Sequence, residues 1–249
     1  MKEKAFGSDC VYPSIFKDYF LEAIYESGYQ SKVIYKDLEN LSINLVDVKI
    51  NMYSVNIFLG TIFKHYKKVK FNVLQVKKIY YTNDYQLYNA KIAINYKGSK
   101  WLMNLEVGNT LKKFPIGGYQ EHILKNLKKK VVFRAYKEEE KLADLFYRVI
   151  NNLGLNATIL HNLYLIYYSN INSNDLGLAL ENIYKSIYDV IDYEEVNNRI
   201  SKLSNNKTLK NKWTIYKSIN DSIDIEYEDI TCCLYLIFLE LKERQIKKP

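Results

Sequence analysis

The hydrophobic pattern of the chain changes near residue 134, and this change constrains the fold more than any other feature. Before it, runs of alternating apolar and polar residues predict strands; after it, apolar residues recur at three- and four-residue spacing, which predicts helices. Only 9 Gly and 3 Pro occur in 249 residues, which argues against many short strands joined by tight turns. We therefore predict an α+β chain, with a small mixed sheet in an α/β domain over 1–134 and a helical domain over 135–249.

The first part is expected to contain both helices and strands. A helix is predicted over 14–27, and a strand over 32–35 leads into a second helix over 38–48. The segment 54–59 is predicted to be a strand that ends at a glycine. The clearest element is a β-hairpin over 88–107 with its turn at 97–99, because apolar and polar residues nearly alternate on both sides of that turn.

Loops and short strands are expected between residue 108 and residue 134. The second part is expected to be all helical, with helices over 140–150, 159–168, 176–189, 193–203, 209–219 and 227–245.

The charge of the chain favours polyanionic partners. Lys and Arg number 36 against 28 Asp and Glu, and the surplus of +8 suits RNA, DNA or nucleotide phosphates; the alternative is that it serves solubility alone. Cys10, Cys232 and Cys233 have neither metal-site spacing nor a plausible disulfide framework, which indicates a reducing cytoplasm. Because no apolar run approaches the roughly 18 residues of a membrane span, we expect a cytoplasmic protein without a membrane partner. Its many Tyr, Lys, Asn and Ile residues are typical of an AT-rich bacterial genome.

Familiar catalytic motifs are absent from the sequence. It contains no G-x-S-x-G, Walker A or G-x-G-x-x-G motif, which removes the support for hydrolase, P-loop and Rossmann functions. Its three histidines, His65, His122 and His161, are too few and too scattered for a metal site or a nucleophilic triad.

Three carboxylates are candidates for metal binding. Glu106 is the one acidic residue of the second hairpin strand, and near the strand end it could serve as a metal ligand for phosphoryl transfer; the alternative is a solvent-facing strand residue. Asp37 and Glu39 form a D-x-E pair after the first strand. In an extended segment both side chains share one face, as metal binding requires, whereas in a helix they are first-turn residues favoured by the dipole.

Lys141 is a candidate phosphate ligand. It lies one turn into the first helix of the second part, where it could present a cation to a cleft between the two parts. The alternative is a solvated charge run in which the lysine pairs with the glutamates before it.

Three stretches carry a family resemblance. Residues 139–145 (EEKLADL) look like an A-E-K-L-x-A-L helix, and residues 161–167 (HNLYLIY) look like an R-D-L-Y-D-L-Y helix some 20 residues later. Residues 104–109 (NLEVGN) look like an L-E-F-G-x-R strand that carries an acidic metal ligand. In their order these stretches resemble the AbiEii/AbiGii abortive-infection nucleotidyltransferase toxins, a branch of the DNA polymerase β-like nucleotidyltransferase superfamily.

The first half of the chain departs from the motifs of this family. Family members have a strand that leads into K-G-G-T-x-L-S, followed by S-x-D-x-D on the next strand. The alignment that we prefer places the first motif on 33–42, without its glycines. It places the second on 54–58, where Asn56 and Phe58 stand in place of both metal-binding aspartates. A second alignment makes Asp37 and Glu39 the acid pair.

The resemblance implies a nucleotidyltransferase-like α/β domain followed by helices. It implies Mg²⁺-dependent transfer of a nucleotide from an NTP to an RNA acceptor such as tRNA, or to a protein, by a toxin with a cognate antitoxin. The residues carried over are Glu106, Asp37 and Glu39 as catalytic metal ligands, Lys141 on the triphosphate, and Lys36, Ser42 and Ser54 as nucleotide contacts. The missing aspartates imply an alternative, a catalytically degenerate relative that binds nucleotide, nucleic acid or a protein partner.

Overall fold

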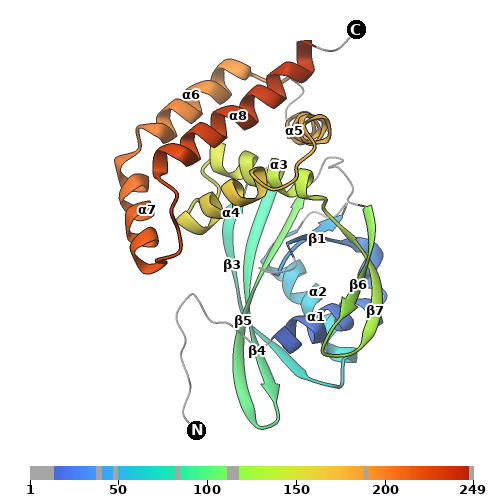
Figure 1. Ribbon diagram of the computed structural model, residues 1–249. Helices are drawn as coiled ribbons and strands as arrows, with labels where there is room; N and C mark the ends of the chain where they lie inside the picture. The colour runs from blue at the N-terminus through green and yellow to red at the C-terminus, as the bar shows by residue number, and fades with distance from the viewer. Residues whose placement is uncertain are drawn as a thin grey trace. The chain divides into compact units, whose positions relative to one another are not determined.

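The computed structural model describes residues 14–37, 41–46, 50–81, 85–110, 118–187 and 190–246 (Figure 1). The chain divides into two compact units, Met1–Tyr136 and Lys137–Pro249. The first contains a mixed sheet with helices and the second contains helices, so the α+β class predicted from the sequence is confirmed. None of the described helices combines the length and hydrophobicity that a membrane span requires.

The described elements of the first unit are two helices, a short 3-10 helix and seven strands. They are α1 (Ser14–Glu26), η1 (Tyr29–Lys32), β1 (Val33–Asp37), β2 (Ser42–Val46), α2 (Met52–His65), β3 (Lys70–Tyr81), β4 (Tyr85–Tyr96), β5 (Ser99–Thr110), β6 (Gly118–Leu124) and β7 (Lys129–Ala135). The described elements of the second unit are α3 (Glu138–Ile150), α4 (Ala157–Tyr167), α5 (Ser173–Ile187), α6 (Tyr193–Ser204), α7 (Lys207–Ile219) and α8 (Tyr227–Ile246).

The sheet is mixed, and its order is β3-β4-β5-β2-β1-β7-β6. Strand β2 runs parallel to β5 and β1 runs parallel to β7, while the other neighbouring pairs are antiparallel. The predicted hairpin is confirmed as β4 and β5, with Lys97 and Gly98 in the turn. Both turn residues have positive φ, which matches the twist of the flanking strands. The sheet is wider than the small sheet that the sequence predicts, and the β1–β2 hairpin lies at its centre.

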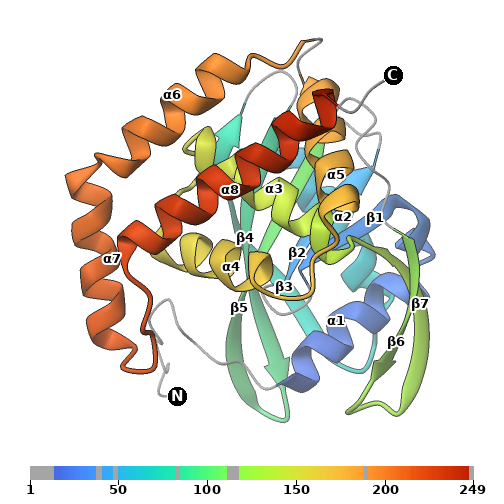
Figure 2. The same ribbon diagram turned by 45° about the horizontal axis from the view of Figure 1, so that its top comes forward.

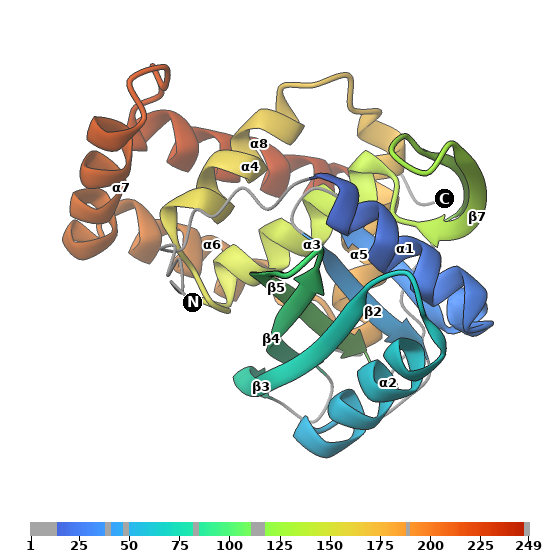
Figure 3. The same ribbon diagram turned by 90° about the horizontal axis from the view of Figure 1, so that it is seen from below.

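Helices α1 and α2 pack on one face of this sheet (Figure 3). Ile43 and Leu45, alternate residues of β2, and Leu41 just before the strand belong to the same buried apolar cluster as Phe20 of α1 and Leu59 of α2. Each aliphatic side chain buried in this way contributes about 1.5–3 kcal/mol. Because side chains alternate along a strand, Ser42 and Asn44 then point to the other face of the sheet.

The helix predicted over 38–48 is wrong, because residues 42–46 form β2. The apolar residues of this segment fit two periods. Leu38, Leu41 and Leu45 fit the three- to four-residue spacing of a helix, whereas Leu41, Ile43 and Leu45 fit the two-residue spacing of a strand. Pairing with β1 on one side and β5 on the other selects the extended form. Residues 38–40 and 47–48 of the predicted helix lie outside the described residues.

The strand predicted over 54–59 is also wrong, because these residues lie in α2. The buried residues of α2 follow a helical period; they are Val55, Phe58, Leu59, Ile62 and Phe63. This period can be recognised only when the residues after Gly60 are included. A capping box begins the helix: Asn51 Oδ1 accepts from Ser54 N at 2.8 Å, and Ser54 Oγ accepts from Asn51 N at 2.8 Å.

The second unit is organised around α8, which packs against α4, α5, α6 and α7 (Figure 2). All six predicted helices are present, with ends within a few residues of the predicted ones. The buried Glu181 of α5 accepts hydrogen bonds from Arg244 of α8 at 2.9 Å and from Lys185 of its own helix at 2.5 Å. This ion-pair set joins the last helix of the unit to an earlier one.

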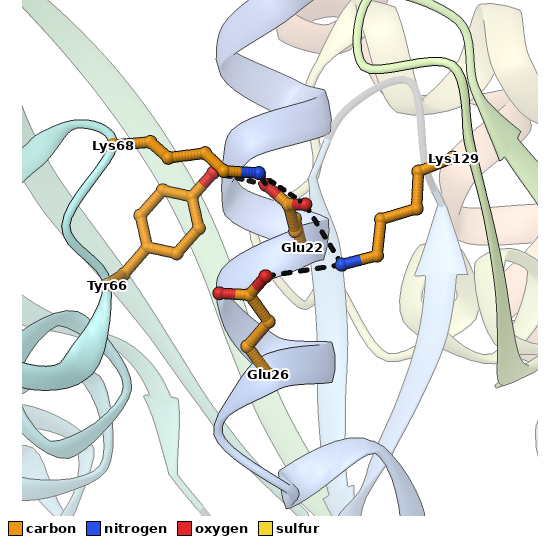
Figure 4. Close-up of polar contacts among 5 residues, drawn as sticks. All are labelled: Glu22, Glu26, Tyr66, Lys68 and Lys129. Atoms are coloured by element: carbon orange, nitrogen blue, oxygen red, sulfur yellow. Dashed lines mark hydrogen bonds and ion pairs between the residues drawn. The ribbon is translucent and has the colours of Figure 1, made fainter.

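A buried carboxylate joins α1 to two distant segments of the first unit (Figure 4). Glu22 is fully buried and accepts hydrogen bonds from Tyr66 at 2.6 Å, from Lys68 at 2.7 and 2.8 Å, and from Lys129 at 3.0 Å. Tyr66 and Lys68 precede β3, and Lys129 begins β7. Burial raises the pKa of the Glu22 carboxyl, but the three donors outweigh burial, so the pKa lies below its ordinary value.

Replacing this carboxylate should destabilise the first unit. Glu22→Gln is expected to lower the free energy of unfolding at neutral pH by about 2 kcal/mol, the scale of hydrogen bonds to a charged group. Because the folded pKa is depressed, the contribution is complete above the ordinary carboxyl pKa of 4.5 and is lost as pH falls through the folded value. Urea unfolding from neutral to acid pH measures this loss.

Glu26→Gln, which removes only a half-exposed pair with Lys129, should change stability by less than about 0.5 kcal/mol. A pH-independent difference for Glu22→Gln would contradict the assignment.

The Ser54 hydroxyl should act on stability rather than on nucleotide binding. Ser54→Ala is expected to reduce the free energy of unfolding by about 1 kcal/mol through loss of the hydrogen bond that Ser54 Oγ accepts from Asn51 N, and to leave nucleotide affinity unchanged. Thr61→Ala in the middle of the same helix is the control, since its hydroxyl bonds to the Ile57 carbonyl and no cap is lost. Urea unfolding and nucleotide titration measure the two effects. Weaker nucleotide binding at unchanged stability would restore the role that the preferred alignment gave Ser54.

Candidate functional site

The centre of the sheet brings together candidate residues from three separate parts of the chain. In the strand register Asp37 of β1 pairs with Ser42 of β2, and Ser42 pairs with Glu106 of β5. Three positions selected independently from the sequence therefore lie side by side on adjacent strands. The side chain of Asp37 and the whole of Glu39 lie outside what the structure describes.

Ser42 and Glu106 are joined directly. The Ser42 hydroxyl donates to Glu106 Oε1 at 2.8 Å, and the backbone N–H of Glu106 donates to the Leu41 carbonyl at 3.1 Å. Ser42 is buried, whereas Glu106 is only partly buried. Glu106 therefore has a neutral hydrogen-bond donor on the neighbouring strand at the position nearest to it.

Asn44 continues the same row of polar side chains. It pairs with Gly108 in the register, and its Nδ2 donates to the Tyr136 hydroxyl at 2.9 Å. Both Asn44 and Tyr136 are buried, and Asn44 Oδ1 has no hydrogen-bond partner within the described part of the chain. Exchanging the amide oxygen and nitrogen would leave the nitrogen unpaired instead, so one buried amide atom lacks a partner in either orientation.

Gly108 is required by its contact with Asn44. A Cβ at this position would lie 2.4 Å from Asn44 Oδ1 and 3.3 Å from a Leu87 methyl group. The glycine of the 104–109 stretch thus gives the asparagine side chain its space above β5. We call the row formed by Ser42, Asn44, Glu106 and Tyr136 the sheet site.

Lys36 lies on β1 next to this row. It is buried, with 4% of its surface exposed. The register shifts between Tyr35 and Asp37, so Lys36 is the extra residue of a β-bulge opposite β2. Bulges turn a side chain out of the regular alternation and are common beside functional sites.

The described residues do not fit a two-metal centre. Among them no group of three or more His, Cys, Asp or Glu side chains is arranged to hold a metal ion. Glu106 is the one carboxylate of the sheet site, and Ser42 and Asn44 are neutral. Two-metal phosphoryl transfer requires several anionic ligands around ions about 3.5–4 Å apart. The described part of the site therefore does not supply the ligands for Mg²⁺.

The preferred alignment of the acidic motif is wrong, because residues 54–58 are helical. The strand that follows β1 is β2, and the side chains that it presents on the Glu106 side are Ser42 and Asn44. Asn44 and Tyr136 were not identified as candidate site residues from the sequence. The alternation L-S-I-N-L-V over 41–46 is the signal that could have found Asn44, whereas nothing local marks Tyr136.

Lys141 belongs to the second unit and is engaged near the start of α3. Its Nζ lies 2.5 Å from Glu138 Oε1, and Glu140 Oε2 accepts from the Lys137 N–H at 2.8 Å. The structure thus contains the pairing with a preceding glutamate that the alternative for Lys141 describes. A role on a triphosphate, and a cleft shared with Glu106 of the first unit, stay predictions.

Comparisons with known proteins give structural likenesses alone. No protein-family model matches the chain, and no curated protein matches it. It is similar to the crystal structure of JHP933 from Helicobacter pylori, with 12% identity and a TM-score of 0.47 over 94% of this chain and 95% of that one. It is also similar to a proposed nucleotidyltransferase from H. pylori, with 14% identity and a TM-score of 0.45 over 94% and 99% of the two chains. At these values the likenesses carry no conclusion about activity.

The contact between Gly108 and Asn44 can be tested by adding one methyl group. Gly108→Ala is expected to lower the free energy of unfolding by about 1–3 kcal/mol, because the new Cβ overlaps Asn44 Oδ1. Asn44→Ala should relieve the overlap, so the double variant should lose less than the sum of the two single variants. Gly118→Ala, where a Cβ meets nothing within 4 Å, is the control. Equal urea midpoints for the two glycine variants would contradict this packing.

Proposed function

We propose that this chain is a nucleotidyltransferase-like protein that binds a nucleotide at the sheet site and lacks metal-dependent transfer activity. The hydrogen bond from Ser42 to Glu106 carries the proposal, since it gives Glu106 a neutral partner on the neighbouring strand β2. The α+β architecture agrees with the fold that the same resemblance implies.

The charge at the sheet site argues against catalysis. A transferring triphosphate must be neutralised by metal ions, and those ions must be held by anionic ligands. Ser42 and Asn44 bring no negative charge, and a single Glu106 cannot hold two ions. Loss of even one preorganised electrostatic group lowers rates by about 10²–10³.

The same residues are suited to binding. Asn44 offers an unpaired amide atom, and hydroxyl groups stand beside it on Ser42 and Tyr136. Such groups recognise the hydroxyls of a ribose or the edge of a base by hydrogen bonds. A buried polar atom without a partner costs about 1–3 kcal/mol, which a bound ligand would recover.

A second candidate function is favoured by the register of Asp37. Its backbone pairs with Ser42 of β2, which in turn pairs with Glu106 of β5, so β2 lies between Asp37 and Glu106. With Asp37 and Glu39 as its acid pair, the chain would be an active transferase that moves a nucleotide from an NTP to RNA, such as tRNA, or to a protein. It could then act as an abortive-infection toxin with a cognate antitoxin.

Transfer of label separates the two functions. The purified protein should transfer no detectable label from any of the four α-³²P NTPs to bulk tRNA with Mg²⁺ or Mn²⁺, because the sheet site lacks the ligands for two metal ions. Robust transfer that disappears in Asp37→Ala or Glu39→Ala would establish the active transferase instead.

The direction in which Glu106→Gln changes NTP affinity provides an independent test. If Glu106 is a hydrogen-bond acceptor and not a metal ligand, Glu106→Gln should leave NTP affinity unchanged or raise it, because a charge that repels phosphates is removed. If Glu106 holds Mg²⁺, the same change should weaken Mg·NTP binding at least about tenfold. Calorimetric titration with and without Mg²⁺ measures the difference. Glu121→Gln, an exposed carboxylate of β6, is the matched control.

A further inference from the structure

A second candidate site lies away from the sheet site, between α2 and β3. A surface pocket of about 530 Å³ is formed there by one continuous part of the chain. Its lining residues are Asn56, Gly60, Phe63, Lys64, Tyr66, Lys67, Val69, Lys70, Phe71, Asn72 and Val73, and we call it the α2–β3 pocket. Its volume lies in the range of small-ligand sites, about 300–1,000 Å³.

The pocket is positively charged and has no acidic lining residue. Lys64, Lys67 and Lys70 are exposed, and none of them forms an ion pair with any residue that the structure describes. Lys68, in the middle of the same segment, differs because it is bound to Glu22. Three cations around one hollow repel each other, so binding of an anion between them is electrostatically favourable.

The walls of the pocket are partly aromatic. Phe63 and Phe71 stack with their ring centroids 4.7 Å apart, and Tyr66 lies 6.0 Å from Phe71. Asn56 and Asn72 add amide groups that can donate and accept hydrogen bonds. The three rings are themselves buried and form the apolar floor of the hollow, so the lysines around it are the groups that can follow a phosphate backbone.

The α2–β3 pocket is separate from the sheet site. Phe63 and Phe71 belong to the apolar cluster that also contains Ile43 of β2. Ser42 and Asn44 alternate with Ile43 and so point to the opposite face of the sheet. A ligand in the pocket is therefore independent of the function proposed for Glu106.

We propose that the α2–β3 pocket binds the phosphodiester backbone of single-stranded nucleic acid. Lys64, Lys67 and Lys70 bind successive phosphates, and the hollow between them accepts a sugar and base turned out of a stack. The backbone of a rigid duplex cannot enter such a hollow, whereas a single strand can. The lysines contact phosphates, which RNA and DNA share, so RNA and DNA strands should bind with similar affinity.

The test compares two triple variants of the full chain. Fluorescence anisotropy with a short labelled oligouridylate should show that Lys64→Gln/Lys67→Gln/Lys70→Gln weakens binding at least about tenfold at low salt. The slope of log affinity against log salt should fall by about 2, because each phosphate contact on a single strand contributes roughly 0.7. The matched control is Lys77→Gln/Lys91→Gln/Lys125→Gln, which removes the same charge at exposed positions outside the pocket and should weaken binding less than about threefold.

A third variant fills the pocket without changing its charge. Gly60 lies in α2, and a Cβ there meets nothing within 4 Å, so Gly60→Leu should fold normally and place a side chain in the hollow. We expect it to weaken oligouridylate binding at least about tenfold at the same salt. Circular dichroism and the urea midpoint verify that the variant is folded.

Several results would overturn the proposal. They are equal losses in the two lysine triples, no binding by the unaltered chain at low salt, or unchanged binding by folded Gly60→Leu. Equal affinity for a duplex of the same length would remove the assignment to a single strand. Equal affinity for an oligoglutamate would remove the assignment to nucleic acid, and a more than tenfold preference between oligouridylate and oligothymidylate would contradict recognition of the phosphates alone.

Discussion

The two-residue period of β2 is the constraint on which both the core and the candidate site depend. Leu41, Ile43 and Leu45 lie in the apolar cluster beneath α1 and α2, and a shift of the strand by one residue would bring Ser42 and Asn44 into that cluster instead. Burying two polar groups there without partners would cost several kcal/mol, so the register is strongly specified. The row of polar side chains on the other face is therefore a consequence of how the core is packed.

Charge is used in two different ways within the first unit. At Glu22 two lysines and a tyrosine surround one buried carboxylate, and the resulting bonds connect α1 to the segments before β3 and at the start of β7. Other lysines lie on either side of Lys68 in the sequence. These are Lys64, Lys67 and Lys70, and they surround a hollow that has no acidic lining residue. The first arrangement satisfies its charges internally and stabilises the fold. The second leaves positive charge on the surface, where an external anion can bind.

The sheet site combines one carboxylate with neutral polar side chains. Glu106 lies across β2 from the end of β1, yet the side chains nearest to it on β2 are an alcohol and an amide. Such groups can select a ligand by hydrogen bonds, but they cannot concentrate the negative charge that holds metal ions. The hydrogen bond of Asn44 to Tyr136 and the space that Gly108 leaves for the amide form one specific packed contact on this face of the sheet.

The sequence by itself determined the α+β class, the β4–β5 hairpin and all six helices of the second unit, because each has a hydrophobic period that local reading detects. It failed for β2 and α2. In β2 the leucines fit two periods, and only pairing with β1 and β5 selected one; in α2 the apolar residues of 54–59 fit a strand until the pattern beyond Gly60 was included. Glu106 and Ser42 could be selected as single residues, but their hydrogen bond spans 64 positions of the chain. Only the tertiary structure decided that bond and the contact of Asn44 with Tyr136, since strand order and register place residues together that no local pattern relates.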